Sequence, residues 1–165
     1  MKYKVMIVED QTMPRELFEL RVQASERFEL ALSIDNAALA DVYCLRFPVD
    51  LILMDVITRD GENGLDAAAR IKRAFPQIKI IIVTSMPECS YLKRAKEIGV
   101  ESFWYKEEQR ESLLDVMERA MNGESVYPGA SPELTLGMAS SYQFTERELD
   151  ILREITSGDT NQEIS

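Results

Sequence analysis

The stretch Asp50-Leu51-Ile52-Leu53-Met54-Asp55 decides the fold of this 165-residue chain. Four apolar residues between two acids are typical of a strand that is buried on both faces, as in parallel sheets covered by helices. The carboxyl end of such a strand opens towards the crevice where parallel sheets bind their ligands. We therefore expect Asp55 to lie at a functional site and the residues before it to lie in the core.

Four further strand-like runs begin near Val5, Phe28, Ile80 and Phe103. Helical patterns separate the runs, so strand and helix alternate five times, which favours an α/β fold with a parallel sheet. Right-handed crossovers then predict a five-stranded, doubly wound sheet. The run at Phe28 is less uniformly apolar than the others, which suits an edge strand. The helices are expected over residues 12–24, 36–47, 64–75, 88–98 and 109–121.

The first of these helices has a regular apolar pattern. Thr12 is a candidate N-cap and Pro14 lies in the first turn, where proline is tolerated. An apolar stripe at helical spacing follows, made of Met13, Leu17, Leu20 and Ala24. Together these features predict a helix that begins at the second residue after Asp10.

The pattern indicates one complete domain followed by a second, incomplete one. The first domain is predicted over residues 1–123, with Gly123 as the C-cap of its last helix. Residues 124–143 are rich in proline, glycine and serine, which is typical of a linker. A capped helix starts again after Phe144, so residues 144–165 are predicted to open another domain.

Composition excludes several classes of protein. The chain has no histidine, which rules out His-based catalytic triads, His-ligated zinc and phosphohistidine chemistry. A formal net charge of −10 argues against nonspecific binding to nucleic acid. No apolar run has the length of a membrane-spanning helix, and two cysteines suit reduced thiols, so a cytoplasmic location is expected.

Polar residues follow four of the predicted strands. Glu9 and Asp10 come after the first strand, Asp55 after the third, Thr84 after the fourth and Lys106 after the fifth. Three carboxylates at one sheet edge need a cation or raised pKa values. Oxygen ligands favour Mg²⁺ or Mn²⁺ over zinc, and an aspartate beside such an ion can attack phosphorus. The lysine and the threonine would then donate to phosphoryl oxygens.

Each of these residues also has an ordinary structural explanation. The acids fit a solvated turn or a helix cap, the threonine fits a strand, and the lysine fits a surface side chain. Their joint occurrence at the ends of successive strands is what favours a phosphoryl-transfer site.

The chain resembles a known family at these same positions. Residues 3–122 are similar to the receiver domain of bacterial two-component response regulators. The matching motifs are Val8-Glu9-Asp10-Gln11, Leu53-Met54-Asp55, Val83-Thr84-Ser85 and Tyr105-Lys106. This resemblance implies a flavodoxin-like sheet of strand order 2-1-3-4-5. The site would lie where the order switches between strands 1 and 3, because open α/β sheets bind their ligands at such a switch point.

The resemblance also implies a role for each site residue. Asp55 would be the phosphoacceptor, and Lys106 would pair with the phosphoryl group. The switch residues would be Thr84 and Phe103, the aromatic residue three positions before the lysine. The Mg²⁺ ligands would be Glu9, Asp10, Asp55 and the backbone carbonyl of Ile57.

One loop departs from the pattern of the family. Receivers usually have a Met-Pro step after the phosphoacceptor and a glycine eight residues beyond it. Here the segment from Val56 to Gly64 lacks the proline and reaches its glycine at nine residues. The path of this loop and the position of the Ile57 carbonyl are therefore open questions for the structure.

The last residues are similar to the start of a LuxR-type helix-turn-helix domain. The resemblance covers Phe144 to Leu152, Gly158 and Thr160 to Ile164. The recognition helix of such a domain would lie beyond Ser165, and the segment carries more acidic than basic residues. DNA binding is therefore expected of the full-length protein and not of this fragment.

The sequence thus predicts a response regulator of the NarL/FixJ type. It would accept a phosphoryl group from a sensor histidine kinase, dimerise on phosphorylation and control transcription, without catalysis beyond its own phosphorylation and dephosphorylation. The alternatives are a pseudo-receiver that binds partners without phosphorylation and, from another class, a Mg²⁺-dependent aspartyl-phosphate phosphatase. A flavodoxin-like cofactor protein ranks last, because the acidic crevice would repel a flavin phosphate.

Overall fold

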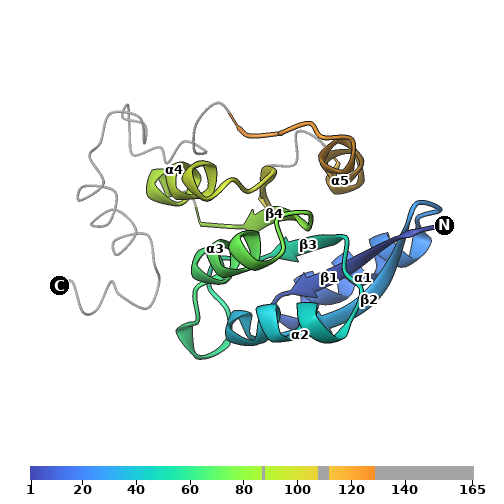
Figure 1. Cartoon of the computed structure of the whole chain (residues 1–165), viewed down its shortest axis with the longest axis horizontal. Coiled ribbons are helices and arrows are strands. Elements are labelled where there is room, and N and C mark those ends of the chain that lie inside the picture. The colour runs from blue at the N-terminus through green and yellow to red at the C-terminus, as the bar shows by residue number, and fades with distance from the viewer. Residues whose placement is uncertain (87, 108–111, 129–165) are drawn as a thin grey trace.

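The computed structural model of the chain describes residues 1–86, 88–107 and 112–128 (Figure 1). Five parallel strands form one sheet of order β2-β1-β3-β4-β5. The strands are β1 (Tyr3–Val8), β2 (Phe28–Ile34), β3 (Leu51–Met54), β4 (Lys79–Thr84) and β5 (Ser102–Tyr105). This architecture confirms the predicted doubly wound sheet and its strand order.

The helices connect successive strands as the alternating pattern predicts. They are α1 (Thr12–Ala24), α2 (Ala40–Arg46), α3 (Gly64–Ala74), α4 (Cys89–Ile98) and α5 (Leu113–Met121), with the 3-10 turns η1 (Ala37–Leu39) and η2 (Arg59–Gly61). The second helix begins later than predicted, because η1 comes first and the Asn36 side chain caps it by accepting from the Ala38 N–H. The predicted start of the fifth helix, residues 109–111, lies outside the described residues.

The sheet separates two hydrophobic cores. One face packs against α2, α3 and α4, and the other against α1 and α5. Every residue of β3 is fully buried, as expected for a strand covered on both faces. Successive side chains alternate between the faces, so Phe103 and Tyr105 of β5 join one core while Trp104 joins the other.

Helix α1 presents its regular apolar stripe to solvent. Met13, Leu17 and Leu20 are 82%, 44% and 63% exposed, whereas Phe18 and Val22 are buried. Two apolar faces therefore occur on this helix, and the one that covers the sheet is the shorter one. Its N-cap position is Gln11 rather than Thr12, and the Gln11 side chain makes no capping hydrogen bond.

Residues 129–165 lie outside the described part of the chain. They contain most of the predicted linker and all of the predicted helix-turn-helix segment. Within the described ranges, no helix combines the length and the apolar character needed to cross a membrane.

The two faces of α1 predict opposite responses to truncation. Replacing Phe18 by Ala should lower the free energy of unfolding by about 3–5 kcal/mol, because it removes a buried ring that packs edge-on against Trp104. Replacing Leu17 by Ala should change it by only about 0.5 kcal/mol in either direction. Chemical denaturation of both variants at low protein concentration measures the difference. Equal losses would contradict the burial described for this helix.

Candidate functional site

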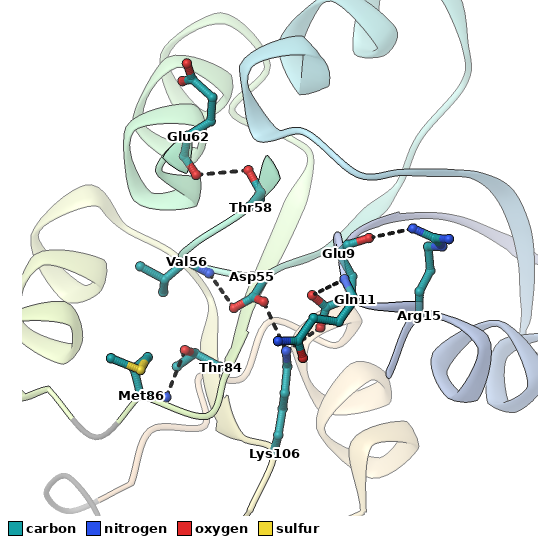
Figure 2. A network of polar contacts seen from close by, with 10 residues as sticks. All are labelled: Glu9, Gln11, Arg15, Asp55, Val56, Thr58, Glu62, Thr84, Met86 and Lys106. Atoms are coloured by element: carbon teal, nitrogen blue, oxygen red, sulfur yellow. Dashed lines mark hydrogen bonds and ion pairs between the residues drawn. The ribbon is translucent and has the colours of Figure 1, made fainter. Parts of the chain in front are cut away.

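Three acidic side chains meet at the carboxyl ends of β1 and β3, which are neighbours in the sheet, and Figure 2 shows two of them, Glu9 and Asp55. Glu9 and Asp10 follow β1, and Asp55 follows β3. One carboxylate oxygen from each of the three residues can be chosen so that all three oxygens lie within 4.8 Å of one another. Glu9 is fully buried and Asp55 is 7% exposed, so water screens their mutual repulsion poorly.

Lys106, which follows β5, reaches across the sheet edge to this cluster. Its Nζ lies 3.0 Å from Oδ2 of Asp55 and also donates to Oε1 of Glu9 (Figure 2). The backbone N–H of Lys106 donates to the carbonyl of Thr84 at 2.9 Å, which continues the pairing of β4 with β5. The sequence prediction that residues from the ends of different strands converge is therefore correct for Glu9, Asp10, Asp55 and Lys106.

The charges in the cluster change the protonation of its members. Burial, followed by the hydrogen bond and the charge of Asp55, raises the pKa of Glu9 to about 7, although Lys106 opposes the shift. Burial also disfavours the charged form of Lys106, but the carboxylates of Asp55 and Glu9 outweigh this cost and raise its pKa. One ammonium group thus offsets only part of the negative charge that three ionised carboxylates would carry.

The phosphoacceptor candidate is held by its own loop on the side opposite the lysine. The Val56 N–H donates to Oδ1 of Asp55 at 2.7 Å, and the Asp55 N–H donates to the Val8 carbonyl at 3.0 Å. Gly64 lies against the same backbone: a Cβ on Gly64 would stand 1.8 Å from the Asp55 carbonyl oxygen. Only glycine fits there, so the start of α3 fixes the end of β3.

Thr84 and Phe103 lie on the same face of the sheet, on the neighbouring strands β4 and β5. Thr84 is buried, and its hydroxyl oxygen accepts a hydrogen bond of 3.1 Å from the Met86 N–H (Figure 2). Phe103 is 2% exposed and packs against Tyr105, with ring centroids 5.1 Å apart. Neither residue is part of the carboxylate cluster, but Thr84 lies at its border because β4 pairs with both β3 and β5.

The long loop after Asp55 closes on itself. Ile57 pairs with Asn63 in an antiparallel bridge, and the N–H and the hydroxyl of Thr58 both donate to the Glu62 carbonyl at 2.9 Å (Figure 2). The tip turns through Asp60, which has a φ of 62°, a left-handed conformation that aspartate tolerates better than most residues. The loop thus turns back between Ile57 and Asn63, and Ile57 itself is 43% exposed.

Sequence reasoning missed several residues that support the site. Thr58 is buried and also accepts from the Ala37 N–H at 2.9 Å, which ties this loop to the start of η1. Asn63 caps α3 by accepting from the N–H groups of Leu65 and Asp66. Arg15 donates to the Glu9 carbonyl at 3.1 Å. The asparagine before a glycine and an apolar helix was a recognisable cap signal, whereas the threonine contact joins loops distant in sequence.

The donor set of the cluster suits a hard cation. It offers carboxylate oxygens from three residues, and the chain contains no histidine that would favour a softer metal. Burial and the neighbouring Asp55 raise the pKa of Glu9, and a divalent ion between these carboxylates would favour their charged forms and so oppose that shift. The residues present therefore fit Mg²⁺ or a similar ion.

The raised pKa of Glu9 predicts a pH dependence of stability. Glu9 ionises near pH 4.5 in the unfolded chain but only near pH 7 in the folded one, so folded protein is destabilised as pH rises through this window. The loss should be on the order of 3 kcal/mol. Denaturant titrations at pH 4.5 and 7.5 measure it as the difference between wild type and Glu9→Gln. Millimolar Mg²⁺ should shrink that difference, and a difference independent of pH would refute the assignment.

The contact between Gly64 and Asp55 gives a second prediction. Replacing Gly64 by Ala should destabilise the fold by at least about 1–3 kcal/mol, because the backbone of Asp55 must move to admit the methyl group. Replacing Asp66 by Ala, an exposed position in the same helical turn, should change stability by about 0.5 kcal/mol. Thermal or denaturant unfolding compares the two variants. Similarly small losses of stability in both variants would show that the backbone of Asp55 can move to admit the methyl group without loss of stability.

Comparison with known proteins gives consistent matches. The sequence profile of the response regulator receiver domain matches residues 5–118. The chain is 32% identical over 173 aligned residues to the response regulator protein VraR of Staphylococcus epidermidis, an alignment that covers all of this chain and 81% of the relative. The VraR protein of Staphylococcus aureus matches at the same identity and coverage.

Solved structures agree with this result. A DNA-binding response regulator of the LuxR family from Staphylococcus aureus superposes with a TM-score of 0.67 at 26% identity, covering 73% of this chain and 99% of that one. A LuxR-family two-component response regulator from Aurantimonas sp. SI85-9A1 shares the fold, with a TM-score of 0.70 at 19% identity over 76% of this chain and 89% of that one. The strand order, the profile match and these relatives together establish that the chain belongs to the LuxR-type (NarL/FixJ) response regulators of two-component systems.

Proposed function

We propose that Asp55 accepts a phosphoryl group from the phosphohistidine of a sensor histidine kinase, and that this modification controls DNA binding. The observation that carries the proposal is the environment of the Asp55 carboxylate. One of its oxygens is held by the Val56 N–H, and the other contacts the Lys106 ammonium group beside two more acids. The carboxylate is buried enough to be oriented and open enough to be reached.

The chain supplies the groups that such a transfer requires. The carboxylate of Asp55 acts as the nucleophile and forms the new bond to phosphorus as the bond to the histidine nitrogen breaks. Lys106 offers a positive charge, and Thr84 a hydroxyl, to the oxygens of the phosphoryl group. Two residues thus stabilise negative charge from neighbouring strand ends, on the side of Asp55 away from β1.

We assign the bound cofactor as Mg²⁺, with Mn²⁺ as a substitute. Glu9, Asp10 and Asp55 would hold it through carboxylate oxygens, and Ile57 through its backbone carbonyl. When bound, the ion neutralises the acids and the incoming phosphoryl oxygens. The closed loop supports the role of Ile57, because its bridge with Asn63 holds the backbone at that residue.

The control of DNA binding depends on the residues that follow the receiver domain. We propose a receiver domain over residues 1–123, a linker over 124–143 and the start of a helix-turn-helix domain over 144–165. The similarity to a LuxR-family regulator described as DNA-binding supports control of transcription in the cytoplasm as the function. The exposed stripe of Met13, Leu17 and Leu20 on α1 supports self-association, since an apolar surface of this kind gains free energy when a second copy covers it.

The direct test is phosphorylation of the whole chain. Incubation with acetyl phosphate and Mg²⁺ should add one phosphate, seen by intact mass spectrometry, and Asp55→Asn should add none. Chelation of Mg²⁺ should abolish the adduct in the wild type. Replacement of Lys106 by Ala should slow its formation by about 10–100-fold, because the charge opposite the transferred group is lost.

Other outcomes separate the alternatives. An adduct that survives in Asp55→Asn would refute the assignment of the phosphoacceptor. No adduct in the wild type would favour a pseudo-receiver that acts by binding partners. Continuous release of phosphate from added phosphomonoesters, with many turnovers, would favour an aspartyl-phosphate phosphatase.

A further inference from the structure

The segment after α5 returns along the outer edge of β5. Val126 forms a parallel bridge with Ser102, its carbonyl accepts from the Phe103 N–H at 2.9 Å, and its N–H donates to the Ser102 hydroxyl at 3.0 Å. β5 is the last strand of the sheet, so its outward N–H and C=O groups would otherwise face solvent. The first residues of the predicted linker thus act as a short sixth strand.

The next residue, Tyr127, packs on the face that contains the switch candidate. Its ring lies 6.4 Å from the Phe103 ring, and its hydroxyl donates to the Val100 carbonyl. The Lys96 ammonium group of α4 lies 5.2 Å from the centre of the Tyr127 ring. Tyr127 therefore contacts α4, the turn after it and β5 together, and its position depends on all three.

Phe103 is enclosed by its aromatic neighbours. Tyr105 lies on one side, with centroids 5.1 Å apart, and Tyr127 covers another side, which leaves Phe103 only 2% exposed. Thr84 lies on the same face of the sheet, since β4 and β5 pair in register and Ile82 stands opposite Phe103. A shift of the Phe103 ring towards Thr84 would remove its contact with Tyr127.

We propose that Val126 and Tyr127 form a docking strand that couples the phosphoacceptor site to the chain beyond residue 128, and that phosphorylation of Asp55 releases it. This inference rests on the proposed function. In this proposal the Thr84 hydroxyl leaves its hydrogen bond with the Met86 N–H to meet a phosphoryl oxygen, and the Phe103 ring shifts towards Thr84. Tyr127 then loses its ring contact, and the bridge between Val126 and Ser102 opens.

Coupling of this kind works in both directions. If phosphorylation favours release of the docking strand, weakening the docking must favour phosphorylation by the same free energy. A variant in which Tyr127 no longer holds the segment should therefore bind beryllofluoride, a noncovalent mimic of the phosphoryl group, more tightly than the wild type. This reciprocity gives a second readout that does not depend on detecting motion of the segment.

The first experiment measures amide hydrogen exchange by NMR in the whole chain. The reporters are the N–H groups of Phe103 and Val126, which carry the two hydrogen bonds of the docking strand. In acetyl phosphate and Mg²⁺ both amides should exchange roughly five- to tenfold faster than in Mg²⁺ alone. In Asp55→Asn the two conditions should give equal rates.

The second experiment uses variants of the docking residue and a matched control. Tyr127→Ala should speed exchange of the Phe103 amide by about tenfold without phosphodonor, and should tighten the equilibrium binding of beryllofluoride in Mg²⁺ several-fold. Tyr127→Phe, which keeps the ring but lacks the hydroxyl, should lie between it and the wild type. The control is Tyr3→Ala, at the opposite edge of the sheet. The Tyr3 ring packs against Phe28 with centroids 5.9 Å apart, and the Arg27 guanidinium group lies over the Tyr3 ring. Tyr3→Ala should leave both readouts unchanged.

Intact mass, recorded on the same samples, separates the two hypotheses. An adduct on Asp55 with unchanged exchange at Phe103 and Val126 overturns the coupling alone. Equal effects of Tyr127→Ala and Tyr3→Ala also overturn it, because they indicate general loss of stability. No adduct on the wild type overturns the proposed phosphorylation and the coupling with it.

Discussion

The structure depends on the balance of charge at the carboxyl end of the sheet. Three acids that follow β1 and β3 lie together, and Lys106, from the far side of β4, brings its ammonium group to the carboxylates of Glu9 and Asp55. Since β4 lies between β3 and β5, the lysine must extend past Thr84 to reach them. Its position thus fixes three strand ends relative to one another, and the deficit of positive charge leaves the cluster receptive to a cation.

This arrangement explains why the supporting residues are so restricted. Burial that strengthens the contact between Lys106 and Asp55 also makes any displacement costly. Gly64 must lack a side chain because the backbone of Asp55 passes within contact of its Cα position, and Thr58 must have a hydroxyl because it joins two loops at once. The charged side chains of the site are therefore positioned by a glycine, a small polar side chain and backbone hydrogen bonds.

The sequence was sufficient to predict the sheet and the converging residues, since both follow from local patterns. Strand β3 is apolar throughout, and parallel topology brings the ends of neighbouring strands together whatever the loops do. The orientation of α1 could not be predicted as well, because Met13 and Leu17 have the same helical spacing as the buried Phe18 and Val22. Tyr127 was invisible to pattern analysis: a single aromatic residue between a valine and a proline has no periodicity, and only tertiary contacts give it a partner.

The closed loop after Asp55 has a consequence for how such domains vary. Thr58 and Glu62 join the two sides of the loop, and the Arg59 N–H donates to the Asp35 carbonyl at 3.0 Å, so only the tip at Asp60 and Gly61 lies outside these contacts. Lengthening such a tip costs little, since loop entropy changes by only about 0.6 kcal/mol when a loop doubles in length. Insertions at this tip can therefore accumulate and acquire new contacts without disturbing the chemistry, which makes it a place where related proteins can diverge and where a peptide tag can be inserted.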